Sequence, residues 1–270
     1  MKAYTVARYG KSNPVVQDAW ILLSNSIYNC PDANTQQGTH ESVFCARPTE
    51  HPYQVSSWSE MKDYYDPNDV IRAAAMMVSV SDQFKGNNNF EYDLVDIVRQ
   101  AIAEKGRLTE KVVEAAFAAG DKKLYKDASD RFLRLILLQD ELLATRPEFK
   151  VGTWIARARS LGNTSEEKDL YEWNARVQIT TWGNRLAADE GGLRDYAHRE
   201  WNGILKDFYY MRWKTWFDYQ TRLLDGKKTA AIDFYAIEEP WTKQTNPYSN
   251  EPEGDCIPTV QRIFAEIFGK

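Results

Sequence analysis

Adjacent carboxylate pairs are the residues of this sequence whose types could support acid–base chemistry. Such pairs include Glu166-Glu167, Asp189-Glu190 and Glu238-Glu239. Hydrolysis of a sugar–sugar bond needs two carboxylates held about 5 to 10 Å apart across a pocket, whereas side chains adjacent on a helix point in different directions. We therefore expect these pairs to be solvated surfaces or helix caps. Because the sequence also lacks a nucleophile elbow, a phosphate-binding glycine loop and a zinc-protease motif, we assign no catalytic residue.

Aromatic side chains are frequent and could stack on a ligand: the chain contains 9 Trp, 15 Tyr and 11 Phe. The stretch DFYYMRWKTWFDY, residues 207–219, distributes its rings around a helix, which favours a buried helix over a stacking surface. Trp182 and Tyr196 differ because they flank a glycine-containing break in the helical pattern, and loops often carry binding sites. The break is therefore either a plain inter-helix loop with aromatic anchors or the rim of a binding site.

The elements that must position these residues are predicted to be helices. Apolar residues recur at helical spacing, Pro14 and Pro67 stand at first helical positions, and Thr164 and Asp195 are expected to be helix caps. The expected helices cover about residues 14–29, 67–80, 90–119, 124–142, 151–161, 165–182, 195–219 and 260–268. No stretch alternates like a strand. The sequence thus predicts one all-α, bundle-like domain over residues 1–270, with a long irregular connection at residues 31–57.

Composition excludes several classes of function. A net charge of -5 without a basic stripe gives no footprint for nucleic acid or an anionic membrane, and no apolar run is long enough to span a bilayer. The start, MKAYTVARYGKSNP, is no secretory signal, so Met1 opens either a cytoplasmic protein or a fragment of a longer one. A Cys30–Cys45 bridge is conceivable, but unpaired thiols, including Cys256, are favoured. Neither the cysteines nor the histidines have metal-ligand spacing, and no cofactor is expected.

Four ordered blocks of the chain resemble one family, glycoside hydrolase family 89, the α-N-acetylglucosaminidases. The blocks are ARYG…DAWILLSNSIYNC, FEYDLVDIVRQ, ITTWG…EGGLRDYAHREWNGILKDFYYMRW and EPEGDCIPTVQRIF. The Trp-Gly…Asp-Tyr-Ala block is the most specific of them. The resemblance is to the C-terminal helical domain of that family.

The resemblance implies an enzyme in three parts, of which this chain is the last. The catalytic glutamates belong to a (β/α)8-type barrel upstream, which this chain does not contain. Trp182, Leu193 and Tyr196 would line the pocket for a terminal α-linked N-acetylglucosamine, and the implied reaction is retaining hydrolysis. The implied partners are therefore the barrel and a glycan. The parent enzyme is expected outside the cytoplasm, at the periplasm or cell surface of a bacterium or in an animal lysosome.

The sequence departs from the family pattern in places. Ala7 stands where the family has an arginine, His198 where a neutral polar residue is common, and residues 183–192 differ in composition from animal members. Two other interpretations stay open: a stand-alone helical glycan-binding or interaction module without catalysis and, ranked last, a complete small enzyme with its own carboxylate pair.

Overall fold

Helices form the regular structure of this computed structural model, which describes residues 1–30, 42–50, 64–190 and 192–269. The helices are α1 (Lys2–Tyr9), α2 (Pro14–Asn25), α3 (Pro67–Ser79), α4 (Asn88–Ala119), α5 (Lys122–Ala144), α6 (Val151–Arg159), α7 (Ser165–Gln178), α8 (Tyr210–Leu224), α9 (Phe234–Thr242) and α10 (Cys256–Phe268). Short helical turns lie at Val43–Cys45, Ser81–Phe84, Pro147–Phe149, Leu186–Glu190 and Leu205–Tyr209. Within the described ranges no strand occurs, only an isolated bridge between Lys150 and Asn202. The all-α prediction is confirmed.

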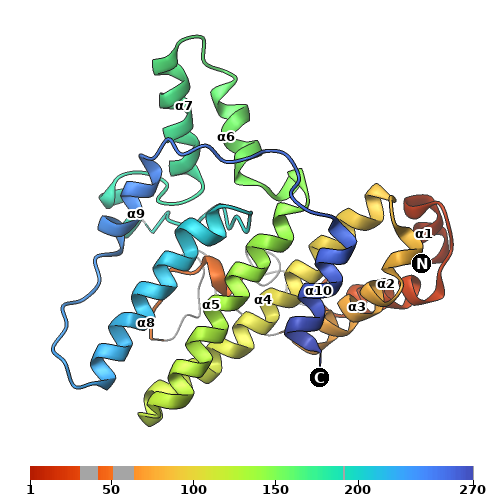
Figure 1. Cartoon of the computed structure of the whole chain (residues 1–270), viewed down its shortest axis with the longest axis horizontal. Coiled ribbons are helices and arrows are strands. Elements are labelled where there is room, and N and C mark those ends of the chain that lie inside the picture. Colours follow the sequence, from red (N-terminus) through yellow and green to blue (C-terminus); the bar gives the residue numbers. More distant parts are fainter. Residues whose placement is uncertain (31–41, 51–63, 191, 270) are drawn as a thin grey trace.

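Two long antiparallel helices, α4 and α5, run through the middle of the molecule (Figure 1). Helix α8 packs along α5, α3 packs on α4, and α2 packs on α3, while α10 lies against α3, α4 and α5 (Figure 1). The ring of Phe132 on α5 lies 4.5 Å from that of Trp213 and 5.6 Å from that of Phe217 on α8, measured between centroids. Phe208, Trp213 and Phe217 are all buried. The prediction that residues 207–219 form a buried helix is confirmed.

Helices α6 and α7 form a hairpin that projects from this body (Figure 1). Gly162 lies at its turn, and Thr164 begins α7 with the expected capping box: the Thr164 hydroxyl accepts from the Glu167 N–H at 3.2 Å, and the Glu167 carboxylate accepts from the Thr164 N–H. The Glu166-Glu167 pair is thus part of a helix cap, as predicted. Side-chain caps also form at the starts of α2 and α3, where Asn13 accepts a hydrogen bond from the Val16 N–H and Asp66 accepts one from the Asn68 N–H.

Removal of the Thr164 cap should weaken the hairpin. We expect Thr164→Ala to lower the free energy of unfolding by about 1 kcal/mol, because one N–H of the first turn of α7 loses its acceptor. Urea denaturation checks this. Ser165→Ala, at the neighbouring position, is the control and should have a smaller effect because its hydroxyl accepts no N–H of α7. Equal effects of the two changes would contradict this role of Thr164.

Several helix boundaries differ from the prediction. Helix α7 ends at Gln178 rather than Trp182, and α10 begins at Cys256 rather than Val260. The helices α1 and α9 were not expected. Pro240 lies inside α9, and a proline normally marks the end of a helical pattern, which explains why no helix was predicted there.

The N-terminal connection is only partly described. Residues 31–41 and 51–57 of the predicted irregular stretch lie outside the described residues, and residues 42–50 contain the turn Val43–Cys45. Phe44 and Cys45 are buried against the core. Cys45 and Cys256 are free thiols, so no bridge joins Cys45 to Cys30, and burial raises the pKa of Cys45. The preference for unpaired thiols is confirmed for Cys45 and Cys256.

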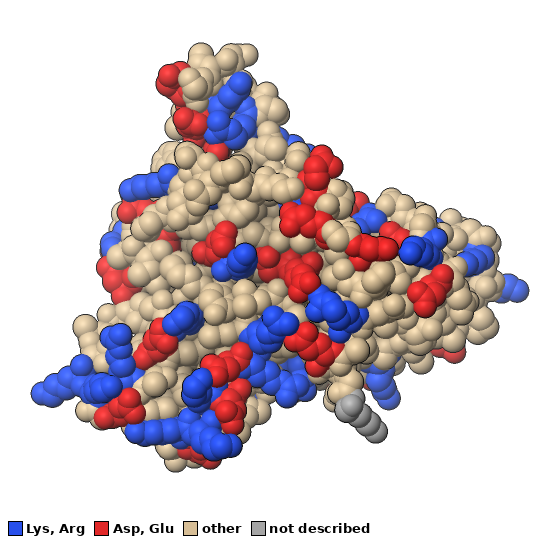
Figure 2. All heavy atoms as spheres, viewed as in Figure 1, with Lys and Arg blue, Asp and Glu red and all other residues tan. Residues whose placement is uncertain are grey.

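The surface carries no single-sign region on the face seen in Figure 2, where acidic and basic side chains are interspersed. This agrees with the expectation drawn from the scattered Lys and Arg residues. In the part of the chain that the structure describes, no helix is both long and apolar enough to cross a bilayer.

Candidate sugar-binding pocket

The break between α7 and α8 folds back on itself and brings Trp182 and Tyr196 together. The Asp195 N–H donates to the Thr180 carbonyl at 2.8 Å, which joins the two sides of the loop. The ring centroids of Trp182 and Tyr196 lie 5.3 Å apart at an interplanar angle of 53°. The two residues remain 38% and 43% exposed, respectively. An exposed pair of touching rings is an apolar surface that a ligand could cover.

The backbone of this loop is held in an uncommon conformation. Among the described residues other than glycine, a positive φ occurs at Trp182 (61°), Asp195 (59°) and His198 (46°). Left-handed backbone is unfavourable for residues with a Cβ atom, so surrounding contacts must stabilise it. Such conformations cluster at functional sites. Trp182 is itself one of the two aromatic residues, and Asp195 and His198 lie within two residues of the other, Tyr196.

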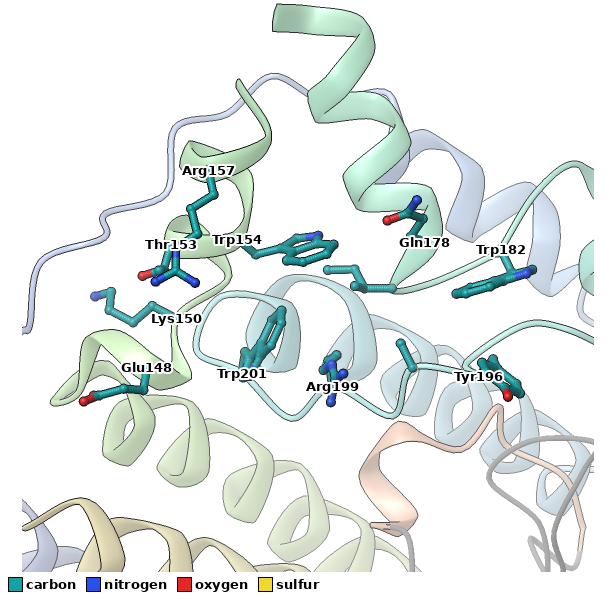
Figure 3. A pocket seen from close by; sticks show the side chains of 12 residues that line it. Glu148, Lys150, Thr153, Trp154, Arg157, Gln178, Trp182, Tyr196, Arg199 and Trp201 are labelled. Carbon is teal, nitrogen blue, oxygen red and sulfur yellow. The ribbon is translucent and has the colours of Figure 1, made fainter. Parts of the chain in front are cut away.

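A pocket of about 510 Å³ opens beside these rings. Its walls come from the start of α6, the end of α7 and the loop before α8. The lining residues are Glu148, Lys150, Thr153, Trp154, Arg157, Gln178, Ile179, Trp182, Tyr196, Ala197, Arg199 and Trp201. Figure 3 shows Trp182 and Tyr196 at one end, with Trp154 and Trp201 farther along.

Leu193, the third residue expected at the site, is not among those that line this pocket. It is half-buried, and its N–H donates to the Ala187 carbonyl at 3.2 Å. The structure therefore brings two of the three expected residues together and leaves the third beside the helical turn Leu186–Glu190, within what was expected to be a loop without regular structure.

Asp195 does not cap a helix, so that prediction was wrong. Its side chain is fully buried and forms an ion pair with Arg212, Nη1 lying 2.9 Å from Oδ1. The helix that was expected to start at Asp195 begins instead at Ile204, with the π-helical turn Leu205–Tyr209 leading into α8. A fully buried partner 17 residues away outweighs the local preference of aspartate for a cap.

The ion pair of Asp195 belongs to a larger buried network behind the aromatic pair. Arg212 Nε lies 2.7 Å from Glu238 Oε1, and Arg47 contacts both Glu238 (2.5 Å) and Asp189 (2.6 Å). Burial acts to lower the pKa of Arg212, but the adjacent carboxylates of Asp195 and Glu238 raise it, so the arginine stays charged. The network ties both sides of the loop to α8 and α9.

Glu238 also corrects an expectation. The pair Glu238-Glu239 was expected at a solvated surface or a cap, yet the Glu238 side chain is completely buried. Only Glu239 matches the prediction, because it pairs with Lys243 at the surface. Asp189 is half-buried and joins the network, whereas its neighbour Glu190 is exposed.

Asp140 on α5 fixes the segment that leads from the pocket into α8. Its carboxylate accepts from the N–H groups of Gly203 (2.6 Å) and Lys206 (3.2 Å) and from Asn202 Nδ2 (2.8 Å). Burial nevertheless raises the pKa of Asp140 to about 6, more than these hydrogen bonds lower it. This carboxylate thus titrates near neutral pH while it holds the wall that carries Trp201.

This shift predicts a pH-dependent stability. Because the folded state binds the Asp140 proton more tightly than the unfolded state, the contribution of protonated Asp140 is complete below about pH 4 and is lost as the pH rises through about 6. The stability of the wild type relative to Asp140→Asn should therefore fall by on the order of 2 kcal/mol between pH 4 and 7.5. Urea denaturation across this range measures it. The other buried carboxylates are present in both proteins, so their effect cancels in the comparison. A difference in stability between the two proteins that does not change with pH would contradict the assignment to Asp140.

The comparison with known proteins decides the family. The family model described as "Alpha-N-acetylglucosaminidase (NAGLU) C-terminal domain" matches residues 1–266. The chain belongs to this family. The resemblance found in the four sequence blocks is thereby confirmed.

Similar proteins have the same fold and are much longer. Human alpha-N-acetylglucosaminidase is 27% identical over 276 residues, which cover 98% of this chain and 35% of the human protein. A family 89 glycoside hydrolase from Clostridium perfringens, solved with 2-acetamido-1,2-dideoxynojirmycin, matches with a TM-score of 0.93 and 35% identity over 98% of this chain and 31% of that one. A structure from Clostridium perfringens in complex with its substrate GlcNAc-alpha-1,4-galactose matches with a TM-score of 0.92. The chain thus spans about a third of the length of these relatives.

Part of the pocket of this α-N-acetylglucosaminidase C-terminal domain was not predicted from the sequence. Trp154, Gln178, Arg199 and Trp201 were not singled out, although Arg199 and Trp201 lie in the most specific sequence block. The sequence pattern around Trp154 did not indicate a pocket, because a tryptophan at helical spacing is normally interpreted as a core residue. Among the described residues no group of three His, Cys, Asp or Glu side chains could hold a metal ion.

Proposed function

We propose that this domain forms one wall of the N-acetylglucosamine pocket of an α-N-acetylglucosaminidase, and that the rest of the pocket lies in the part of the enzyme outside this chain. The exposed Trp182–Tyr196 pair at one end of the pocket is the observation that carries the proposal. Its support is the family membership of the chain and the complexes of similar Clostridium perfringens structures with sugar-like ligands.

The chemistry of the two rings suits a sugar. An indole ring offers an apolar face to the C–H surface of a pyranose, while a phenol combines such a face with a hydroxyl that can hydrogen-bond sugar oxygens. These contacts would hold the terminal residue at a fixed distance from the reacting carboxylates, a positioning role. Leu193 remains a proposed contact from the family resemblance, but Trp182 and Tyr196 take precedence because they line the pocket.

The reaction itself is assigned to the missing part of the enzyme. Retaining hydrolysis requires a nucleophilic carboxylate and an acid–base carboxylate about 5 Å apart. The acidic side chains of the buried network and of the pocket lining do not fit these roles: Asp195 and Glu238 are fully buried and ion-paired, and Glu148, which lines the pocket, pairs with Arg146. We therefore propose that an upstream barrel supplies both carboxylates and that residues 1–270 act as a single helical domain. The parent enzyme is proposed to work outside the cytoplasm.

The test is release of p-nitrophenol from p-nitrophenyl α-N-acetylglucosaminide. It should be measured for this chain alone, for the separately produced upstream region, and for the two together. We expect activity only when both parts are present. Activity of this chain alone would overturn the assignment of the carboxylates to the barrel, whereas an assembled but inactive complex would favour the stand-alone glycan-binding module.

A further inference from the structure

The pocket continues well beyond the two rings assigned to the terminal sugar. Figure 3 shows Gln178 and Arg199 next along the pocket from Trp182 and Tyr196, and then Trp154 and Trp201. A volume of about 510 Å³ falls in the range of pockets that hold drug-sized ligands. The second aromatic pair therefore needs an occupant of its own.

The second pair is held rigidly. The ring centroids of Trp154 and Trp201 lie 6.1 Å apart at an interplanar angle of 47°. Trp154 Nε1 donates to the Ala175 carbonyl of α7 at 2.9 Å, which fixes that ring across the α6–α7 hairpin. Both residues are half-buried and pack on the core. Preformed aromatic walls of this kind bind ligands without a large loss of side-chain entropy.

The polar groups between the two aromatic pairs are available to a ligand. Among the described residues, Gln178, Arg199 and the indole N–H of Trp201 make no hydrogen bond to protein through their side chains, and Arg199 has no carboxylate partner. The Arg199 guanidinium instead lies over the Trp201 ring, 5.4 Å from its centroid. Apolar ring faces edged by free hydrogen-bond donors match the two surfaces of a pyranose, C–H on one side and hydroxyls around the rim.

We propose that the Trp154–Trp201 end of the pocket binds the sugar residue to which the terminal N-acetylglucosamine is attached. This inference rests on the proposed function, because it takes Trp182 and Tyr196 as the position of the terminal sugar. Trp154 and Trp201 provide the walls, and Gln178 and Arg199 donate hydrogen bonds near the linkage between the two sugars. The domain then selects an N-acetylglucosaminide whose leaving group is itself a sugar.

The proposal predicts that Trp201 acts on one class of substrate only. In the complete enzyme, Trp201→Ala should lower kcat/KM for GlcNAc-alpha-1,4-galactose by about tenfold, as expected for loss of a stacking contact. The same change should alter kcat/KM for methyl α-N-acetylglucosaminide by less than about twofold, because a methyl group cannot reach the second pair. Release of free N-acetylglucosamine measures both reactions.

Two further variants test the second site without disturbing the fold. Gln178→Ala and Arg199→Ala remove exposed side chains without hydrogen-bond partners among the described residues, so they should leave stability unchanged and lower the disaccharide kcat/KM by roughly threefold. Trp173→Ala is the matched control, since it removes an exposed tryptophan of α7 outside the pocket. It should not change kcat/KM for either substrate.

The outcomes separate this inference from the function on which it rests. If the pocket variants lower kcat/KM equally for both substrates, or for neither, the second sugar site is wrong while the proposed function stands. If the wild-type complete enzyme hydrolyses neither substrate, both the proposed function and the second site are overturned. A decrease in kcat/KM for the disaccharide alone, in all three pocket variants, supports the inference.

Discussion

Replacement of Arg212 with methionine is expected to lower the free energy of unfolding by about 3–5 kcal/mol. Arg212 is fully buried and is in ion-pair contact with two fully buried carboxylates, Asp195 and Glu238. The variant would leave these carboxylates without their central counter-charge, and an uncompensated buried charge is far more unfavourable than the absence of the whole pair. Urea denaturation at pH 7 is the measurement.

A control for Arg212→Met lies on the same helix. Lys214 pairs with Asp218 at the exposed surface of α8, so Lys214→Met should change stability by no more than about 0.5 kcal/mol. The difference in free energy of unfolding between the wild type and Arg212→Met should also be smaller at lower pH. Burial raises the pKa of Asp195, and a protonated Asp195 no longer needs a counter-charge. A loss of less than about 1 kcal/mol would show that the network contributes little to stability.

The Arg212 network also links stability to the pocket. Asp195 precedes Tyr196 directly, and its N–H donates to the carbonyl of Thr180, two residues before Trp182. Loss of the arginine would therefore release the segment that holds the aromatic pair together. Damage to the pocket and damage to the fold are thus expected to occur together in the Arg212 variant.

Replacement of Trp182 with alanine is expected to separate these two effects. In the complete enzyme it should lower kcat/KM for p-nitrophenyl α-N-acetylglucosaminide by roughly 10- to 100-fold, because the terminal sugar loses its apolar wall and its fixed position. Stability should change little, since the side chain is 38% exposed. Alanine also retains a Cβ atom, so the unfavourable positive φ of this position persists in the variant.

Leu186→Ala is the matched control for Trp182. Leu186 lies in the same loop, is 60% exposed and does not line the pocket. Its replacement should leave kcat/KM within about twofold of the wild type. If Trp182→Ala behaves in the same way, the aromatic pair does not contact the reacting sugar, and the proposed function loses the observation that carries it.

Local interactions explain how much of the fold could be predicted. Asn13, Asp66 and Thr164 accept hydrogen bonds from N–H groups two or three residues later, as their positions before helical patterns indicate. Gly120 adopts a φ of 68° at the end of α4, the conformation that favours glycine. These interactions depend on one turn of chain, so the sequence determined them without help from the rest of the molecule.

The pocket could be predicted only in part. The glycine-containing break and its flanking aromatic residues identified Trp182 and Tyr196, but not that Trp154, from α6, would complete the wall with Trp201. No spacing rule relates residues on separate elements. Leu193 was placed by resemblance alone, and the structure leaves it outside the lining of the pocket.

The sequence by itself determined an all-α fold, most of its helices and caps, the buried aromatic helix and the family to which the chain is similar. Only the tertiary structure decided the roles of Asp195 and Glu238, which were expected to be a cap and a solvated residue and are instead buried partners of Arg212. The physical reason is distance along the chain. Caps and amphipathic faces form within a few residues, whereas burial of a charge is tolerated only where folding brings a distant counter-charge to it.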